Sequence, residues 1–441
     1  MPGKGPNMRV AVARMAGRSC AALGRLLPGL LLILTLSMHL PAGRAHAQAA
    51  QDFRSFLEAL WPEAQAMGVT RQTFDMALRG VEPDLALPDL VLPGRDEVKG
   101  QAEFTRTPAQ YLDVGYLTKL AEQGKALKAQ HAASLARIER ELGVQPQFVL
   151  AIWGRETAFG AHKSTYYIIK ALATQAYLGR RKDMFRYELL HALAMLQEGV
   201  RTRETMVGSW AGAMGLTQFM PSEFHTLAYD LDGDGRKDIW NSVPDALASA
   251  ANQLRSKGWV PGQVWGYEVR LPASISCLQE GPDNAKPLSE WVKLGVTRVG
   301  GDFPAKALDQ SAFLLAPAGS YGPVFLALEN FLVIKRYNMS DLYALFVGNL
   351  GDRIAGGRDF VTPWAEVQQL SAKGIEGIQE GMQAQGYAVS KIDGKAGMNT
   401  RALVGAYQKA NGLKVDCWPS EALLKHVRSR KPPTPQAKRQ D

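Results

Sequence analysis

The sequence has little cysteine: three residues among 441, at positions 20, 277 and 417. So few cysteines exclude a small domain built on a dense disulfide framework. Cys277 and Cys417 stand far apart in the chain. An oxidising compartment would permit a disulfide between them, but no further cysteines form a framework around the pair. We therefore expect Cys277 and Cys417 to be free thiols.

The first 47 residues lack Asp and Glu, although they carry six Lys and Arg residues. An apolar run, LLPGLLLILTLSMHLPA, follows this basic start, and AHA ends at Ala47. A basic region, an apolar region and a small-residue cleavage site are typical of a secretory signal peptide. The alternative is a membrane anchor, but the run contains Pro28 and is shorter than the roughly 20 residues that a span needs. We predict a signal peptide over 1–47 and a periplasmic mature protein without a membrane anchor.

A large charge excess is also absent from the predicted mature chain. The formal net charge is +9, but six positive charges lie in the first 47 residues, which leaves +3. A mildly basic chain gives no reason to expect nucleic-acid binding, and it is compatible with an exported protein that works near an acidic polymer. No solenoid-type repeat is apparent either.

Hydrophobic spacing indicates mainly helices before residue 355. Apolar residues recur at helical intervals in five segments, 52–66, 116–142, 183–200, 245–257 and 324–350. Strand-like alternation is short and lies mainly in 264–272. The sequence therefore predicts a mainly α (α+β) body over 48–355 with a small β element.

A Gly- and Pro-marked joint, GGRDFVTPW, follows this body. It predicts a linker over 356–367, since such residues favour turns and loops. A compact unit is expected over 368–428. The remaining residues, 429–441, are basic and rich in proline, which predicts a disordered tail.

The stretch AIWGRETAFG, residues 151–160, places a carboxylate within an apolar helix that opens near Pro146. Four residues share one face of this helix, at positions i, i+3, i+4 and i+7: Val149, Ile152, Trp153 and Glu156. Burial beside Trp153 would raise the pKa of Glu156, and a carboxylic acid that stays protonated near neutral pH suits a general acid acting on a glycosidic oxygen. A salt bridge to Arg155 or to another partner is the structural alternative.

A second stretch, GSWAGAMGLTQFMPS at 208–222, combines small residues with uncharged polar ones. Small residues would let the backbone approach a ligand closely: Ala211, Gly212, Ala213 and Gly215. Ser209 and Gln218 offer uncharged hydrogen bonds that suit sugar hydroxyls and amides. Taken alone, the segment is equally compatible with a tight loop between helices.

Taken together, these two stretches resemble the lysozyme-like core of lytic murein transglycosylases. More narrowly, the chain resembles the membrane-bound lytic transglycosylase B family in a soluble, unlipidated form. Further matching stretches are DLDGDGRKDIWNSVPDALASAANQL, WGYEV and RYNMSDLYAL, so that the resemblance covers roughly 50–355. It implies a lysozyme-like catalytic core with a flanking helical region.

The resemblance implies cleavage of the β-1,4 bond between N-acetylmuramic acid and N-acetylglucosamine without water. The muramyl C6 hydroxyl would attack, leaving a 1,6-anhydro end. Glu156 would protonate the leaving oxygen and then accept the proton of that hydroxyl, while the acetamido oxygen of the substrate stabilises C1. Neither 151–160 nor 208–222 supplies a second carboxylate, which is compatible with this scheme.

The family motifs also imply substrate-binding residues, which carry over to this sequence as Ser209, Gln218, Asn338, Tyr343, Arg180 and Arg181. The first two would orient the N-acetyl group and the sugar. Asn338 and Tyr343 would complete the pocket around Glu156, with a turn residue as the alternative for Asn338. The two arginines of LGRRKDM would meet the glycan or its peptide, with a solvated helix end as the alternative.

The acidic segment DLDGDGRKDIWN begins a predicted EF-hand-like loop over 230–245. Loop positions 1, 3, 5 and 7 are occupied by Asp230, Asp232, Asp234 and the carbonyl of Arg236. A hard cation would relieve the repulsion among three carboxylates. Asn241 replaces the usual bidentate Glu, and the family pattern implies that Asp245 closes the site instead. We predict a structural Ca²⁺ site of modest affinity, with Na⁺ as another occupant; an Asp/Gly turn without metal is the alternative.

The unit over 368–428 resembles a three-helix peptidoglycan-binding domain, through QGY and DGKAGMNTRALVGAYQKANGL. Such a domain would anchor an enzyme on the wall and raise the local substrate concentration. The resemblance implies glycan strands as the partners and no organic cofactor. Nothing in the sequence suggests an obligate oligomer, so we expect a monomer, with other wall enzymes as further candidate partners. Two other readings stay open: a hydrolytic muramidase with a second carboxylate about 5–9 Å from Glu156, and a non-catalytic wall-binding scaffold.

Overall fold

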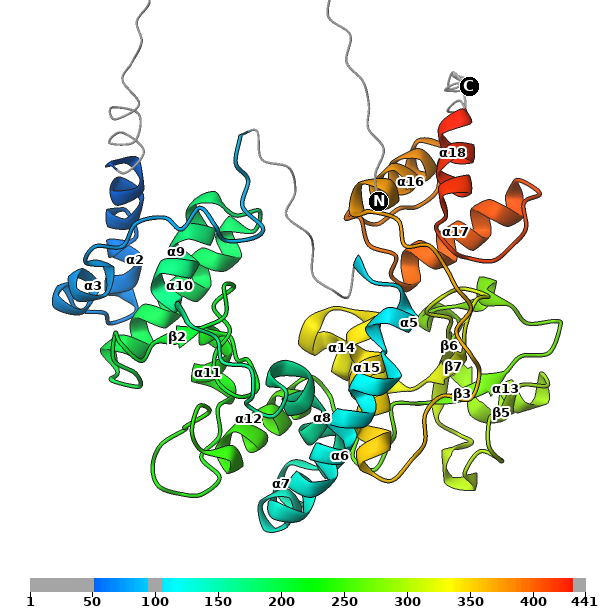
Figure 1. Cartoon of the computed structure of the whole chain (residues 1–441), viewed down its shortest axis with the longest axis horizontal. Helices are drawn as coiled ribbons and strands as arrows, with labels where there is room; N and C mark the ends of the chain where they lie inside the picture. The colour runs from blue at the N-terminus through cyan, green and yellow to red at the C-terminus, as the bar shows by residue number, and fades with distance from the viewer. Residues whose placement is uncertain (1–50, 94–104, 431–441) are drawn as a thin grey trace, which may run out of the picture. The chain divides into compact units, whose positions relative to one another are not determined.

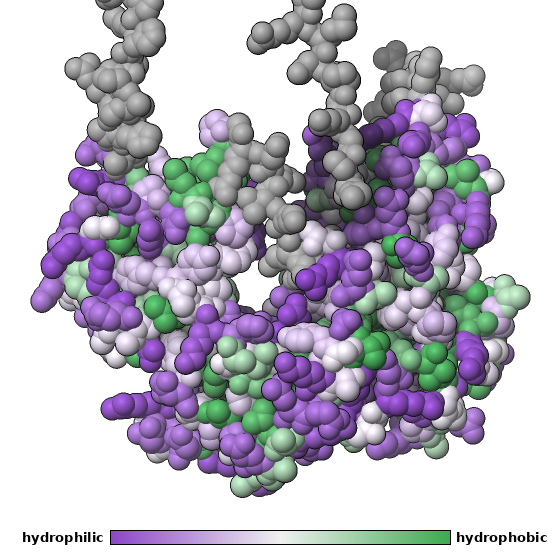
Figure 2. Space-filling view, in the orientation of Figure 1, coloured by the Kyte–Doolittle hydropathy of each residue, from purple (hydrophilic) through white to green (hydrophobic). Residues whose placement is uncertain are grey.

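The computed structural model describes residues 51–93 and 105–430 (Figure 1). The predicted signal peptide and nearly all of the predicted basic tail lie outside these residues. Within the two described ranges, no helix combines the length and the apolar character that crossing a membrane requires. On the face drawn in Figure 2, hydrophilic side chains predominate and apolar ones form small separate patches.

The described residues are mainly helical, as the sequence predicts. After a helical stretch at 51–58, the α-helices are α2 (Trp61–Ala66), α3 (Arg71–Leu78), α5 (Pro108–Tyr111), α6 (Val114–Gln130), α7 (Ala132–Leu142), α8 (Pro146–Thr157), α9 (Ile168–Leu178), α10 (Lys182–Gln197), α11 (Pro221–Leu227), α12 (Val243–Ser256), α13 (Leu288–Lys293), α14 (Glu329–Asn338), α15 (Asp341–Ile354), α16 (Ala372–Ala384), α17 (Met398–Ala410) and α18 (Glu421–Ser429).

Helix α8 lies at the centre of the largest hydrophobic cluster. It contacts α6, α7, α12 and α15, and every residue from Phe148 to Gly154 is buried. A helix that is apolar on all sides is stable only where other elements surround it. The tertiary packing thus encloses the helix that carries Glu156 far more completely than a one-faced amphipathic pattern indicates.

A small antiparallel sheet has the strand order β4-β6-β7-β3-β5. Its strands are β4 (Lys286–Pro287), β6 (Ser311–Leu315), β7 (Val324–Ala327), β3 (Gly266–Arg270) and β5 (Thr297–Arg298), and a separate pair joins β1 (Tyr166–Tyr167) to β2 (Val207–Gly208). The prediction of a strand in 264–272 is confirmed by β3. The prediction of helix from residue 324 is wrong for β7, because periodicity alone cannot distinguish a short buried apolar strand from helix.

The expectation that Cys277 and Cys417 are free thiols is wrong. The two residues form a disulfide with their Cα atoms 6.1 Å apart. The 3₁₀ helix that begins at Cys277 packs against α17, and both cysteines are buried beside Ala316. Spacing along the sequence could not show this, since only the packing of the C-terminal helices against the sheet region brings the two residues together.

Asp352, on α15, is a half-buried carboxyl that accepts a hydrogen bond from Trp265 Nε1 at 2.9 Å. Burial raises the pKa of Asp352 to about 7. Ionising Asp352 therefore lowers the free energy of unfolding. This loss of stability is zero below the unfolded pKa of about 4, grows as the pH rises, and reaches its full size above about pH 7.

We expect Asp352→Asn to raise the free energy of unfolding by about 1–3 kcal/mol at pH 8 and by little at pH 4. The amide oxygen can still accept from Trp265, so the variant removes mainly the charge. Urea unfolding across this pH range measures the difference between variant and wild type. A difference that does not change with pH would contradict the assignment.

Candidate active site

Glu156 is the penultimate residue of α8, at the point where the chain turns sharply. Ala158, which ends the helix, is in the left-handed region with φ 49°, and Phe159 follows with φ 58°. The ring of Phe159 folds back against Gly154, where a Cβ atom would lie 2.7 Å from the Phe159 Cζ atom. Glycine at this position therefore permits the tight return of the chain behind Glu156.

Tyr343 contacts Glu156 directly. Its hydroxyl donates a hydrogen bond to Glu156 Oε1 at 2.5 Å. Tyr343 is fully buried in the first turn of α15, and its backbone N–H donates to the hydroxyl of Ser340, which caps that helix. Burial, together with the charge of Glu156, raises the pKa of Tyr343 well above its usual value. The phenol is therefore neutral at working pH and remains a donor to the carboxylate.

Arg155 points into an aromatic cluster. Its guanidinium donates to the hydroxyl of Tyr111 from Nη2 at 2.6 Å and lies over the rings of Tyr343 and Phe346. Burial opposes the charge of this side chain, but Tyr111 and Glu156 keep the pKa of Arg155 above its usual value. A charged Arg155 thus contacts the ring of Tyr343, whose hydroxyl donates to Glu156.

Tyr337, on α14, is a residue that the sequence analysis missed. Its ring stacks on Tyr343 with centroids 6.1 Å apart, and its hydroxyl donates to the carbonyl of Thr217 at 2.7 Å. Burial raises the pKa of Tyr337, and the charges of Glu156 and Glu223 raise it further. The motif RYNMSDLY contained both tyrosines, but the sequence alone gave no sign that the turn between α14 and α15 would stack them.

The loop over 208–222 is joined to this cluster from two sides. Besides the bond from Tyr337, the Thr157 hydroxyl donates to the carbonyl of Leu216 at 2.7 Å. Within the loop, the Ser209 hydroxyl accepts from the Ala213 N–H at 3.0 Å. Gln218, with φ 57°, donates from Nε2 to the carbonyl of Gly215 at 3.0 Å. Ser209 and Gln218 thus already support the shape of the loop.

The loop glycines face the protein interior, contrary to the expectation that they admit a ligand. A Cβ atom on Gly212 would lie 2.5 Å from Leu172 Cδ2, and one on Gly215 would lie 2.7 Å from the carbonyl oxygen of Ile239. Both glycines also have positive φ, 89° and 71°. These residues let the loop pack closely on its neighbours rather than on a substrate.

A second residue near the site that the sequence predictions did not include is Glu188, on α10. Its buried carboxylate accepts from the Ser222 N–H at 2.9 Å and the Ser222 hydroxyl at 2.8 Å, in the first turn of α11. A carboxylate at this end of a helix satisfies N–H groups that have no partner within the helix. Glu188 therefore fixes the end of the 208–222 loop.

The remaining predicted residues have varied surroundings. Asn338 ends α14, directly after Tyr337, and is half-buried. Arg180 and Arg181 precede α10 and both form ion pairs with Asp89, at 3.6 Å and 3.1 Å. Both pairs are partly exposed, and they join the arginines to the segment before residue 93.

The acidic loop brings together three of its predicted ligands. Carboxylate oxygens of Asp230, Asp232 and Asp245 all lie within 4.8 Å of one another. Asp245 is buried and accepts from the backbone N–H of Leu231 at 2.8 Å. Asp234 is not a member of this cluster of described residues; its Oδ1 accepts from the Arg236 N–H at 2.8 Å. The oxygen donors and their separation fit a Ca²⁺-sized cation, which takes ligands at about 2.3–2.6 Å.

Comparison with known proteins gives consistent matches. A family model described as the transglycosylase SLT domain matches residues 52–352. The chain is 32% identical over 235 residues to the membrane-bound lytic murein transglycosylase B of Escherichia coli (strain K12). That match covers 53% of this chain and 63% of the relative, which is less than two thirds of its length.

Solved structures match more of the chain. SltB3 from Pseudomonas aeruginosa, crystallised in complex with NAG-anhNAM-pentapeptide, is 41% identical with a TM-score of 0.76, over 86% of this chain and 99% of that chain. The soluble lytic transglycosylase SltB1 from the same organism is 28% identical with a TM-score of 0.56, over 69% of this chain and 98% of that chain.

Proposed function

The chain belongs to the lytic transglycosylase family that carries the transglycosylase SLT domain, and we propose that it cleaves peptidoglycan glycan strands to leave 1,6-anhydromuramic acid ends. The observation that carries the proposal is the hydrogen bond from Tyr343 to Glu156, at the end of a buried helix that is bonded to the 208–222 loop. SltB3 was crystallised with NAG-anhNAM-pentapeptide, a fragment that contains an anhydro sugar, and this complex supports the same product class.

In the proposed reaction, Glu156 gives its proton to the glycosidic oxygen as the bond from C1 of N-acetylmuramic acid to O4 of N-acetylglucosamine breaks. The acetamido oxygen of the substrate stabilises the positive charge at C1. Glu156, now a carboxylate, accepts the proton of the C6 hydroxyl as O6 bonds to C1. No water is consumed, and Glu156 ends in its starting protonation state.

Tyr343 orients the Glu156 carboxyl, and Tyr337 couples that pair to the 208–222 loop through Thr217. Ser209, Gln218 and Asn338 are proposed to contact the sugar and its N-acetyl group, and Arg180 and Arg181 the glycan or its peptide.

Mass spectrometry of the fragments released from purified sacculi tests the function. The proposal expects muropeptides lighter by one water than hydrated ones. Hydrated reducing ends would indicate a muramidase, and the absence of any release would favour a non-catalytic scaffold.

Loss of the Tyr343 hydroxyl should reduce the chemical step. We expect Tyr343→Phe to lower kcat about 10- to 100-fold with little change in KM, because the hydroxyl acts on the reacting carboxyl rather than on substrate binding. The Tyr343 hydroxyl donates to the carboxylate form and so favours ionisation of Glu156. Without this donor Glu156 stays protonated to higher pH, and the alkaline limb of the pH–rate profile should move to higher pH. Unchanged kcat and an unchanged profile would rule out this role.

We also propose that the acidic loop binds a structural Ca²⁺ through Asp230, Asp232 and Asp245. The carboxylate of Asp234 and the carbonyl of Arg236 would become further ligands if the loop rearranged around the cation. The cluster of carboxylate oxygens within 4.8 Å supports the proposal. The cation would balance the carboxylates and fix the loop, whose Ile239 carbonyl accepts from the Leu216 N–H of the 208–222 segment at 2.9 Å.

Millimolar Ca²⁺ should stabilise the wild-type protein against thermal unfolding. A Ca²⁺ concentration of 100 times Kd adds about 2.7 kcal/mol to the free energy of unfolding. We therefore expect Tm to rise by several degrees, and EGTA should abolish the rise. Asp232→Asn should show no rise, whereas Asp283→Asn, an exposed Asp outside the loop, should behave as wild type. Equal Ca²⁺ responses in all three proteins would contradict the site.

The helices α16, α17 and α18 are proposed to form a peptidoglycan-binding domain, within the domain limits predicted from the sequence, and the mature protein is proposed to be periplasmic. The disulfide between Cys277 and Cys417 supports an oxidising compartment.

A further inference from the structure

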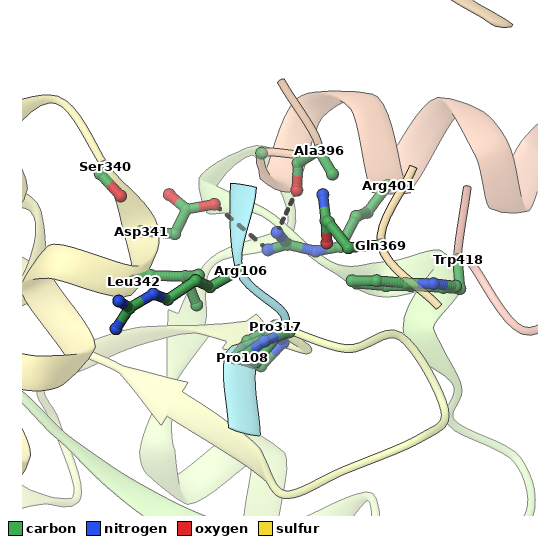
Figure 3. Close-up of a pocket in the computed structure, with 11 residues that line it drawn as sticks. Arg106, Pro108, Pro317, Ser340, Asp341, Leu342, Gln369, Ala396, Arg401 and Trp418 are labelled. Atoms are coloured by element: carbon green, nitrogen blue, oxygen red, sulfur yellow. Dashed lines mark hydrogen bonds and ion pairs between the residues drawn. The ribbon is translucent and has the colours of Figure 1, made fainter. Parts of the chain in front are cut away.

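The C-terminal helices meet the rest of the chain at a seam built around a buried arginine (Figure 3). Arg401, on α17, is only 2% exposed. Its Nη2 donates to Glu280 Oε1 at 2.5 Å and to Asp341 Oδ2 at 3.2 Å. A small pocket of about 40 Å³ lies beside it. The seam thus contains three buried charged residues, a type that is almost never fully buried unless it is paired: Arg401, Glu280 and Asp341.

Asp341 receives most of its partners at this seam from the C-terminal helices. Besides Arg401, the Met398 N–H donates to Asp341 Oδ2 at 2.8 Å, and Lys335 Nζ lies 2.7 Å from Oδ1. Burial alone would raise the pKa of Asp341, but the charges of Arg401 and Lys335 lower it below its usual value. The carboxylate thus stays ionised and holds α14, α15 and α17 together.

Asp341 is also the first residue of α15, two residues before Tyr343. The same turn contains Ser340, whose hydroxyl accepts from the Tyr343 N–H at 3.3 Å. The Ser340 cap bonds the Tyr343 backbone to the start of α15, so that Asp341 and Tyr343 lie in one capped turn. A displacement of Asp341 would consequently displace the Tyr343 hydroxyl from Glu156.

We propose that Arg401 is a positioning residue of the active site: it acts through Asp341 and the first turn of α15 to set the Tyr343 hydroxyl on Glu156. The proposal rests on the proposed function and extends it, since it makes the C-terminal unit part of the catalytic apparatus and not only a wall anchor. A buried ion pair is weak as a source of stability but can fix one geometry among several, which suits this task.

The test is a double-mutant cycle on the full mature chain, with anhydro-muropeptide formation from purified sacculi as the assay. We expect Arg401→Met to lower kcat about 10-fold with KM unchanged within about twofold, and to move the alkaline limb of the pH–rate profile in the same direction as Tyr343→Phe. Arg401→Met combined with Tyr343→Phe should be no slower than Tyr343→Phe alone, because both act through one hydroxyl. Arg255→Met, an exposed arginine in the last turn of α12, is the matched control and should behave as wild type.

Removing Arg401 leaves Glu280 and Asp341 buried without their shared partner, so that variant could fail to fold. Asp341→Asn is therefore measured in parallel, since it keeps the shape of the side chain; the same loss in kcat and the same non-additivity with Tyr343→Phe are expected. The proposal would be overturned if the losses in kcat multiplied in the double variants. It would also be overturned if the single variants changed only KM or kept full activity. If wild-type protein forms no anhydro ends the proposed function itself fails, which is a separate outcome.

Discussion

Glu156→Gln should abolish the release of anhydro-muropeptides, with a loss of about 10³-fold or more in kcat. The amide cannot give a proton to the glycosidic oxygen, and it cannot accept one from the C6 hydroxyl. General acid and general base catalysis each contribute about 10²–10⁴-fold, and the proposed reaction assigns both to this one side chain. Tyr343 can still donate to the amide oxygen, so the fold of the site should survive the change.

Glu223→Gln is the informative comparison for that experiment. The charges of Glu156 and Glu223 both act on Tyr337, so Glu223 is a carboxylate of the same neighbourhood. Its Oε1 is paired with Lys257 Nζ at 2.8 Å, which suits a structural partner better than a catalytic base. We expect Glu223→Gln to retain most of the activity. A loss as severe as that of Glu156→Gln, together with hydrated products, would indicate a two-carboxylate hydrolase instead.

Sacculi digested with each protein and analysed by mass spectrometry separate these outcomes. Both variants should retain the far-UV circular dichroism and the thermal unfolding transition of the wild type. Persistence of anhydro products at wild-type rates in Glu156→Gln would remove this residue from the chemistry.

Reduction of the Cys277–Cys417 disulfide should produce the largest loss of stability. The bond closes a loop with a sequence separation of 140 residues. A crosslink across so long a loop restricts the unfolded chain strongly, and its loss typically lowers the free energy of unfolding by about 2–5 kcal/mol. Because the bond also joins α17 to the 3₁₀ helix beside the sheet, its loss should loosen the C-terminal helices first.

Urea unfolding of oxidised and reduced protein measures this effect. The double variant Cys277→Ala/Cys417→Ala should unfold like the reduced wild type and should not respond to reductant. If oxidised and reduced proteins unfold at the same urea concentration, the disulfide contributes nothing, and other contacts hold the C-terminal unit, among them the Arg401 network and the hydrogen bond from the Tyr321 hydroxyl to Asp416.

Much of the candidate site could be predicted from local sequence. The start of α8 at Pro146, the place of Glu156 on that helix and the acidic loop all depend on residues close together in the chain. Each of these features depends on a local signal: proline in a first helical turn, the spacing of apolar residues, or the spacing of carboxylates. Such signals lie within a short segment of the chain, so they can be read from a single sequence.

The tertiary structure decided what distant residues do to one another. The partners of Glu156, Cys277 and Asp341 come from 60 to 187 positions away: Tyr343, Cys417 and Arg401. The periodicity of 324–350 predicts helix where the structure has β7, because burial, and not periodicity, selects between strand and helix for a short apolar run. The loop glycines likewise serve packing against Leu172 and Ile239. Local sequence determined which chemical groups the site would contain, whereas their orientation depended on close packing between elements that no single-sequence pattern records.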